Sequence, residues 1–484
     1  MSAVASPFAG PRELVAPAGI AVSDICRLGA TELGAAMRAG TLSAHEITAA
    51  FLNQIDRLNP VYNAVVSLRE RSAILAEADA ADAHRASGAA CGPLHGLPIA
   101  IKDLAATNGL RTTYGSPVYA DNVPAADDPG VARIRAAGAI IIGKTATPEF
   151  GFGSHTYNPV FGITRNAFDP SLSAGGSSGG AAVALALRML PVADGSDMGG
   201  SLRNPAGYNN VYGLRPSQGR VPNPAAADLY FTQLATDGPM ARTAADLALL
   251  LAVQAAHDPA APLSLGAGDG VADASAIRRV GWLGDLAGHL PVEAGVLDVC
   301  SYALARLERA GCRVEEVRPD FDMEKLWRAF VVLRQFSTAG KYRPLFEAPE
   351  HRDRLKPEML WEIEGGLSLS ALAVYEAACV RSDWFRECLR MFGEVDALAL
   401  PSAQLFAFPA EWHWPREIAG RTMDSYHRWM EVVVPGTMSG CPVVSLPAGF
   451  APGMRAMGLQ VIGRPRQDGA LIDLARRYES MEDN

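Results

Sequence analysis

Residues 173–201 read SAGGSSGGAAVALALRMLPVADGSDMGGS, with a glycine- and serine-rich segment at each end. The first eight of these residues contain four glycines and three serines. The apolar run AAVALALRML that follows predicts a helix, and LPVADGSD predicts a strand that ends in a loop. A helix followed closely by a strand is typical of α/β proteins. The stretch therefore predicts an α/β fold and places two flexible serine loops beside one such unit.

The first serine loop has two simpler interpretations. A plain Gly/Ser linker is flanked by polar, disordered sequence, whereas this loop runs directly into an apolar helix. The segment GSSGG (176–180) also matches the G-x-S-x-G nucleophile turn, with Ser178 in the middle. That turn needs a strand immediately before it, and RNAFDPSLSA is loop-like. No histidine lies in a recognisable catalytic context, so Ser178 is not assigned as a nucleophile.

A phosphate-binding loop is the third alternative, because GAIIIGKT (138–145) matches G-x-x-x-x-G-K-[ST]. A phosphate-binding loop needs its strand before the first glycine and flexible backbone between the two glycines. Here the four intervening residues, Ala-Ile-Ile-Ile, are themselves strand-forming. We therefore expect a buried strand at this position and no nucleotide site.

Helices and strands alternate through the rest of the chain. Helices are expected at 30–40, 43–60 (with Pro60 at its end), 72–87 and 130–137, and over much of 320–430. Strands are expected at 97–103, 139–142, 278–284, 441–450 and 458–465. The Gly-, Ala- and Pro-rich segment 257–276 is expected to be a surface loop, and residues 1–20 a loosely docked arm.

Composition excludes several classes of protein. The 484 residues are 49% hydrophobic and 20% charged, with a net charge of −9 and no block of Lys or Arg. A nucleic acid or a membrane is therefore not expected as a partner. Seven scattered cysteines without a C-x-x-C pair argue against a disulfide framework or a zinc site. Without a signal peptide or an apolar run of about 18 residues, a cytoplasmic location is expected.

Three segments form a specific combination. These are GLPIAIKD, which contains Lys102, then the first serine loop with Ser177, then DGSDMGGSLRNPAG with Ser201. In this order and at this spacing they resemble the amidase signature family of serine hydrolases. The resemblance covers about residues 90–225, and weaker matches reach both ends. It implies a Ser–cis-Ser–Lys triad of Ser201, Ser177 and Lys102, with a cis peptide bond before Ser177.

The resemblance also implies the organisation of the chain. It predicts one large α/β domain at 21–480, in which helices cover both faces of a mixed, twisted central sheet. An N-terminal arm would occupy residues 1–20, the catalytic core about 90–225, and a more variable substrate-pocket region about 320–430.

The residue types suit amide hydrolysis, which needs a nucleophile, a stabilised oxyanion and a proton for the leaving amine. Glycines before Ser201 let backbone N–H groups approach a carbonyl oxygen. The candidate oxyanion hole is therefore formed by Met198, Gly199 and Gly200, together with the Ser201 N–H. A free serine hydroxyl is a poor nucleophile, so a base is also needed.

Lys102 is the candidate base, and it can serve only if burial lowers its pKa from the usual value of about 10.4. The neighbouring LPIAI supplies apolar surroundings, and Asp103 is expected to point to the other side of the strand. Ser177 would relay the proton between Ser201 and Lys102. The alternative is that Lys102 lies at the end of a strand and extends its amine into solvent.

Three further residues occupy positions that match the family. Ser178, Asp197 and Arg203 are expected to support the two serine loops through hydrogen bonds and an ion pair. Arg203 has an alternative role, which is to bind a substrate carboxylate.

The substrate is less well defined by the sequence. Glutamine-dependent transamidation subunits carry an Asp five residues before a Pro that corresponds to Pro435, and this chain has Met430 there. That difference disfavours glutamine, and residues 147–169 look more like stand-alone amidases. An apolar or aryl amide is therefore expected. The alternatives are a carbamate or ester hydrolase of the same mechanism, or an amidotransferase A-type subunit.

Four aromatic residues between 411 and 430 are candidates for an apolar substrate pocket, with packing of helices on the core as the alternative: Trp412, Trp414, Tyr426 and Trp429. A small-molecule amide is the expected partner, and neither a cofactor nor a metal is expected. A homodimer is left open.

Overall fold

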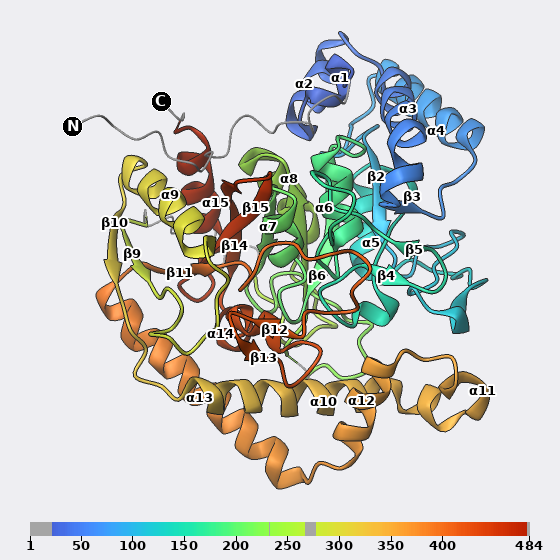
Figure 1. Cartoon of the computed structure of the whole chain (residues 1–484). Helices are drawn as coiled ribbons and strands as arrows, with labels where there is room; N and C mark the ends of the chain where they lie inside the picture. The colour runs from blue at the N-terminus through green and yellow to red at the C-terminus, as the bar shows by residue number, and fades with distance from the viewer. Residues whose placement is uncertain (1–21, 232, 267–276, 482–484) are drawn as a thin grey trace.

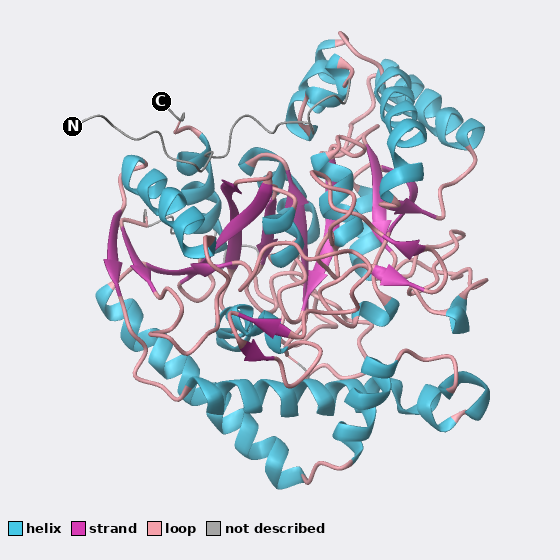
Figure 2. Ribbon diagram, viewed as in Figure 1, coloured by secondary structure: helices cyan, strands magenta, loops and turns pink. Residues whose placement is uncertain are grey.

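The computed structural model describes residues 22–231, 233–266 and 277–481. It is a mixed α/β structure in which helices flank a large central sheet (Figures 1 and 2). The expected arm at 1–20 and residues 267–276 of the expected surface loop lie outside the described residues. The expected fold class is confirmed.

The central sheet has eight strands in the order β10-β9-β11-β15-β14-β7-β8-β6. Their bounds are β6 (Val192–Asp197), β7 (Tyr212–Arg215), β8 (Thr236–Ala241), β9 (Arg279–Trp282), β10 (Arg313–Glu316), β11 (Ala397–Pro401), β14 (Val443–Ala451) and β15 (Arg455–Gly463). The pairs of β9 with β10 and β11 are parallel, and the other neighbours are antiparallel. The sheet is therefore mixed, and β6 and β10 are its edge strands.

A second sheet of three strands has the order β1-β3-β2. Its strands are β1 (Val65–Val66), β2 (Pro98–Lys102) and β3 (Ile140–Thr145), with β2 and β3 parallel. β2 lies beside β6, where the Lys102 N–H donates to the Asp194 carboxylate at 2.9 Å. Two short hairpins complete the strands: β4 (Tyr157–Asn158) with β5 (Gly162–Ile163), and β12 (Glu417–Ile418) with β13 (Arg421–Thr422).

Helices occupy three regions of Figure 1. The N-terminal group is α1 (Asp24–Arg27), α2 (Ala30–Ala39), α3 (Ala44–Tyr62) and α4 (Arg71–Ala86). The helices packed around the sheets are α5 (Pro129–Ala136), α6 (Gly179–Ala186), α7 (Asn204–Tyr208), α8 (Ala244–Gln254), α9 (Val296–Arg309), α14 (Val434–Ser439) and α15 (Asp468–Glu479). Along the lower edge run α10 (Met323–Glu347), α11 (Pro349–Arg352), α12 (Pro357–Leu367) and α13 (Ala371–Glu394). Short 3₁₀ helices are η1 (Pro117–Tyr119), η2 (Glu149–Gly151) and η3 (Arg428–Val433).

Most of the expected elements form, but one helix end is misplaced, and the expected helical region 320–430 also contains β11 and the β12–β13 hairpin. GAIIIGKT forms strand β3, as expected, and is not a phosphate-binding loop. Pro60 does not end its helix, because α3 continues to Tyr62 and stops at Asn63, whose φ is +49°. A proline in the last turn removes only one backbone hydrogen bond, and Asn63 in the left-handed conformation closes the helix.

Among the described helices, no single one has the length and apolar composition needed to cross a membrane. Taken together, α12 and α13 reach that length and composition, but the pair is bent by 105°.

Helix α6 sets the position of the first serine loop, and glycines allow its close approach to the small sheet. All eight of its residues are buried. A Cβ on Gly180 would lie 2.3 Å from the Ala146 backbone nitrogen and 2.6 Å from the Ala64 carbonyl oxygen. Because backbone atoms cannot move aside cheaply, this position accepts only glycine.

We expect Gly180→Ala to lower the free energy of unfolding by about 1–3 kcal/mol, because the added methyl overpacks α6 against backbone. Gly130→Ala is a matched control, since Gly130 is also the second residue of a helix and a Cβ there meets nothing within 4 Å. Thermal denaturation of both variants measures the difference. Equal melting temperatures would contradict the packing argument.

Candidate active site

Lys102 ends strand β2, and its amine is buried among hydroxyl groups. The residue is 1% exposed. Its Nζ lies 2.8 Å from Ser177 Oγ, 2.8 Å from Ser178 Oγ and 3.0 Å from Ser196 Oγ. In the described part of the chain, no carboxylate forms an ion pair with it. The lysine therefore does not point to solvent, and its neighbours accept or donate hydrogen bonds without carrying charge.

Burial lowers the pKa of Lys102 to about 7, although the carboxylates of Asp194 and Asp197 oppose the shift. The Asp103 side chain accepts hydrogen bonds from the Thr113 backbone N–H at 3.0 Å and from its hydroxyl at 2.6 Å. It therefore points away from the amine, as expected for the next residue of a strand. A large fraction of Lys102 is neutral near pH 7 for this reason.

The first serine loop brings Ser177 and Ser178 to this amine. The peptide bond between Gly176 and Ser177 is cis, as expected. A Cβ on Gly176 would lie 3.0 Å from the backbone of Ser154 and His155. The loop is therefore packed tightly against residues 154–156, and both serine hydroxyls face Lys102.

The second serine loop follows β6 and carries Ser201. The Ser178 N–H donates to the Ser201 carbonyl oxygen at 3.2 Å, which joins the two loops. Gly200 has a φ of +93°, and a Cβ there would lie 2.8 Å from Val433. Ser201 is 9% exposed, and its hydroxyl hydrogen-bonds to none of the described residues, Ser177 included. The structure thus brings Lys102 and Ser177 into contact and leaves the Ser201 hydroxyl uncommitted.

Backbone N–H groups of this loop differ in availability. The Gly200 N–H donates to Asp197 Oδ1 at 3.0 Å. Within the described residues, the N–H groups of Met198, Gly199 and Ser201 have no acceptor. A carboxylate therefore already occupies the Gly200 N–H, one of the donors expected for the oxyanion hole. The remaining donors are those of Met198, Gly199 and Ser201.

An ion cluster beneath the loop involves Asp197 and Arg203. Arg203 donates from Nε and Nη2 to the two oxygens of Asp197 at 3.0 and 2.9 Å. Its Nη1 donates to the Val433 carbonyl and to Gln460 Oε1, each at 2.8 Å. Although burial opposes it, the guanidinium groups of Arg203 and Arg215 hold the pKa of Asp197 well below its usual range. Arg203 is fully buried, so it supports the loop and cannot reach a substrate carboxylate.

Three of the four aromatic candidates line one small pocket. Trp414, Tyr426 and Trp429 line it together with Tyr157 and Lys356. Its volume is about 10 Å³, which is room for about one water molecule. Trp412 is not among the lining residues; it is 52% exposed and stacks on Phe408.

Sequence reasoning missed a second aromatic group beside Ser177. A Cβ on Gly151 would lie 3.5 Å from Ser177 Oγ, and the residues on either side of Gly151 are aromatic. These two phenylalanine rings and three tyrosine rings form one group, in which the contacting pairs of rings have centroids 5.1 to 6.3 Å apart. We call this group the Ser177-side aromatic cluster; its members are Tyr114, Tyr119, Phe150, Phe152 and Tyr342. The segment EFGF (149–152) was the available signal.

One group of acidic and histidine side chains has the spacing of metal ligands. One ligand atom each from His289, Glu324 and Glu431 lie within 4.8 Å of one another. Arg428 lies among them, with Nη2 at 2.5 Å from Glu324 Oε2 and Nε at 2.9 Å from Glu431 Oε2. The guanidinium supplies the positive charge there, so the group is an ion-pair network.

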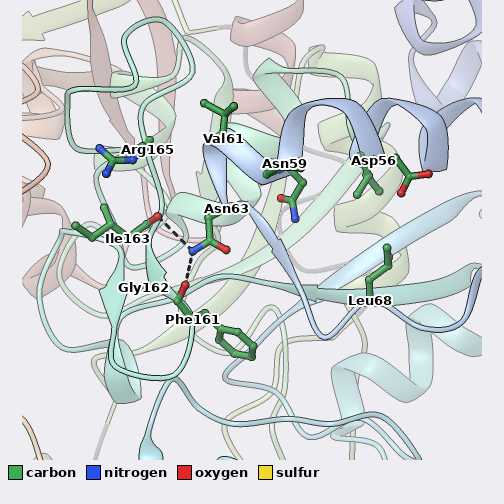
Figure 3. A pocket seen from close by; sticks show the side chains of 11 residues that line it. Asp56, Asn59, Val61, Asn63, Leu68, Phe161, Gly162, Ile163 and Arg165 are labelled. Carbon is green, nitrogen blue, oxygen red and sulfur yellow. Dashed lines mark hydrogen bonds between the residues drawn. The ribbon is translucent and has the colours of Figure 1, made fainter.

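A larger pocket of about 740 Å³ opens elsewhere on the surface (Figure 3). It lies between the end of α3 and the β4–β5 hairpin. Asn63 closes one side by donating from Nδ2 to the carbonyl oxygens of Phe161 and Ile163, at 2.7 and 3.2 Å. Its lining contains none of the residues expected to act in catalysis.

Several known proteins are similar to this chain in sequence and in structure. Residues 46–472 match the protein family described as Amidase. The acylamidase of Rhodococcus erythropolis is 33% identical over 464 residues, covering 94% of this chain and 95% of that protein. The A-type subunit of the glutamyl-tRNA(Gln) amidotransferase of Chloroflexus aurantiacus is 32% identical over 499 residues, covering 95% and 98%. A bacterial aryl acylamidase of the amidase signature enzymes has a similar structure, with a TM-score of 0.86, 27% identity and coverage of 93% and 96%.

Arg203→Met is expected to lower the free energy of unfolding by about 3–5 kcal/mol, because it leaves a buried carboxylate with one partner fewer. Arg313→Met is the control, since Arg313 is 77% exposed in its ion pair with Glu315; its effect should stay within about 1 kcal/mol. Urea denaturation of both variants provides the comparison. A small effect at Arg203 would show that the cluster does not hold the loop.

Proposed function

This chain belongs to the amidase signature family, and we propose that it cleaves apolar or aryl amides through an acyl-enzyme on Ser201. It is a hydrolase of amide carbon–nitrogen bonds and acts on small-molecule amides. We propose both the residues that perform the reaction and the kind of amide that is cleaved. The observation that carries it is the contact of 2.8 Å between the buried Lys102 amine and Ser177.

Acylation begins with two proton transfers. Neutral Lys102 accepts the Ser177 proton while Ser177 accepts the Ser201 proton, and Ser201 Oγ bonds to the carbonyl carbon. The carbonyl oxygen becomes an oxyanion, and the N–H groups of Met198, Gly199 and Ser201 are the donors available to it. Collapse of this intermediate breaks the carbon–nitrogen bond. The amine leaves with a proton from Ser177, which recovers one from Lys102.

Deacylation repeats the same steps with water. Lys102 and Ser177 together remove a proton from water, whose oxygen attacks the acyl carbon. The second intermediate then releases the carboxylic acid as the Ser201 hydroxyl regains a proton. All protons are returned, and no redox step is involved.

The Ser177-side aromatic cluster supports an aryl leaving group. Ser177 returns the proton to the leaving nitrogen, so the amine part of the substrate lies on its side of Ser201. Gly151 lies close to Ser177, since a Cβ there would be 3.5 Å from Ser177 Oγ, and the neighbouring rings of Phe150 and Phe152 make the surroundings apolar and aromatic. The names of two relatives, acylamidase and aryl acylamidase, agree with this preference.

Glutamine is disfavoured as a substrate despite the similarity to amidotransferase subunits. Met430 is 7% exposed and packs in the large hydrophobic core, so it offers no charge to a substrate ammonium group. Glu431 next to it pairs with Arg428 and His289. Carbamates and esters would form the same type of acyl-enzyme, and a panel of anilides, aliphatic amides, carbamates and esters separates these classes.

The rate should depend on pH through Lys102. Because the base acts in its unprotonated form, kcat/KM should rise as the pH increases through about 7 and level off above it. Anilide hydrolysis followed across this range measures the profile. Lys144→Arg is a suitable control, because Lys144 is also fully buried but bonds to Ala105 and Thr107, so its replacement should not move the inflection. A flat profile from neutral to alkaline pH would rule out a lysine base.

A fluorophosphonate should form a covalent adduct at Ser201. Mass spectrometry of the digested protein locates the adduct, and Ser201→Ala should abolish it. Ser171→Ala, at an exposed serine outside the two loops, should leave labelling unchanged. An adduct at Ser178, or at no serine, would overturn the assignment of the nucleophile.

A further inference from the structure

We propose that Arg334 determines specificity by donating a hydrogen bond to a neutral acceptor, such as a second carbonyl, on the acyl part of the substrate. This inference rests on the proposed function, because it places the acyl group relative to Ser201. Arg334 lies in the middle of α10, 133 positions after the candidate nucleophile, and none of the motifs identified in the sequence includes it.

Two sides of the Arg334 guanidinium are firmly held. Nε donates to Glu362 Oε1 at 2.5 Å, and Nη2 donates to Tyr426 Oη at 2.9 Å. The Tyr426 hydroxyl in turn donates to Glu362 Oε1 at 2.5 Å. Arg334 is 7% exposed and Glu362 is fully buried. The guanidinium therefore has a single, defined orientation.

The third nitrogen has no good acceptor. Among the described residues, the only hydrogen-bond partner of Nη1 is Met198 Sδ at 3.2 Å. A thioether sulfur is a weak acceptor, and Nη1 carries two N–H donors. A buried charged donor without a strong acceptor is unfavourable. A carbonyl oxygen brought in by a substrate would supply the acceptor that the protein lacks.

The position of Nη1 places this acceptor beside the Ser201 loop. Met198 stands directly before Gly199, and its N–H is one of the candidate oxyanion donors. Phe330, one turn before Arg334 on α10, approaches the same loop, since a Cβ on Gly199 would lie 3.4 Å from its ring. The guanidinium of Arg334 also lies over the Phe152 ring, with Cζ 5.3 Å from the ring centroid, so α10 borders both the Ser201 loop and the Ser177-side aromatic cluster. Nη1, however, points to Met198, beside the candidate oxyanion donors, and a substrate presents its acyl carbonyl to these donors. The acyl group is therefore the part that meets Nη1.

Charge favours a neutral acceptor over a carboxylate. Glu362 already neutralises the guanidinium, and its second oxygen, Oε2, has no hydrogen-bond partner in the described structure. His427, 3.7 Å from Glu362, adds no positive charge near neutral pH, because burial lowers its pKa well below the usual value. A substrate carboxylate at Nη1 would meet the field of Glu362, and the neighbouring cations Lys356 and Arg428 are already paired with other glutamates.

Matched anilides test the proposal in the wild-type protein. Ketone anilides with the second carbonyl at acyl carbon 3, 4 or 5 are compared with partners in which a methyl-bearing carbon replaces that carbonyl. We expect kcat/KM for at least one ketone to exceed that of its partner by about tenfold or more, equal to about 1.4 kcal/mol. The carboxylate analogue, succinanilate, should be a poorer substrate than the best ketone. Ratios near one for all three pairs, or a preference for succinanilate, would overturn the proposal.

A substitution at Arg334 tests whether this residue causes the preference for the ketone substrates. Arg334→Lys keeps a cation for Glu362 but removes the forked donor toward Met198, so the ketone-to-alkyl ratio should fall to about one. Arg428→Lys is the matched control, since Arg428 is also a buried arginine paired with glutamates but contacts neither serine loop; its ratio should stay as in the wild type. An equal loss for all substrates in Arg334→Lys, with the ratio kept, would indicate a structural role and contradict the proposal.

Competition with a fluorophosphonate separates this inference from the proposed function. Absence of labelling at Ser201 would refute the nucleophile and, with it, the inference. Labelling at Ser201 that the ketone anilide slows no better than its alkyl partner would refute the inference alone. Better protection by the ketone supports it even where turnover is slow.

Discussion

The site depends on one buried amine whose hydrogen-bond partners, among the residues that the structure describes, are all hydroxyl or carbonyl groups. Lys102 would normally carry a charge at neutral pH, and burial without a paired carboxylate shifts the balance toward the neutral form. Its hydrogen-bond partners come from the first serine loop and from Ser196 of β6. In the proposed mechanism, a neutral amine next to Ser177 is what allows a serine to act without histidine. The rest of the architecture serves to bring these groups together without adding a charge to them.

The junction between the two sheets achieves this arrangement. β2 brings Lys102 to the edge strand β6, and the Asp194 carboxylate accepts its backbone N–H. The Ser201 loop continues from β6 and is fixed from below by the pair of Asp197 and Arg203. This pair takes up the donor of Gly200 and leaves those of its neighbours available. The charged side chains that hold the Ser201 loop therefore lie beneath it, whereas serine hydroxyls and backbone N–H groups face the site.

Local sequence patterns predicted the parts of the site that lie in short segments. Short apolar runs marked β2 and β3, and the two glycine–serine loops, through their resemblance to the family, marked Ser177 and Ser201. The occupied N–H of Gly200 could not be predicted, because it depends on the rotamer of Asp197 within the folded loop. The end of α3 was misplaced because Pro60 lies in the last turn, where its missing N–H has little effect.

Contacts between distant segments were beyond the reach of sequence patterns. Arg334, Glu362 and Tyr426 lie in three separate segments, and no spacing rule connects them. The aromatic residues from 411 to 430 could be identified as candidates, but their separation into pocket-lining Trp414 and exposed Trp412 needed the packed structure. The Ser177-side aromatic cluster likewise combines a loop near β3 with α10.

The most direct test of this account is the pKa of Lys102 itself. The chain contains only five lysines, so carbon-13 labelling at Cε gives five signals, and Lys102→Met identifies the one that matters. We expect this signal to titrate at about pH 7, below Lys144 at about 8. A Lys102 signal that titrates at about 10.4, as in a solvated lysine, would contradict it.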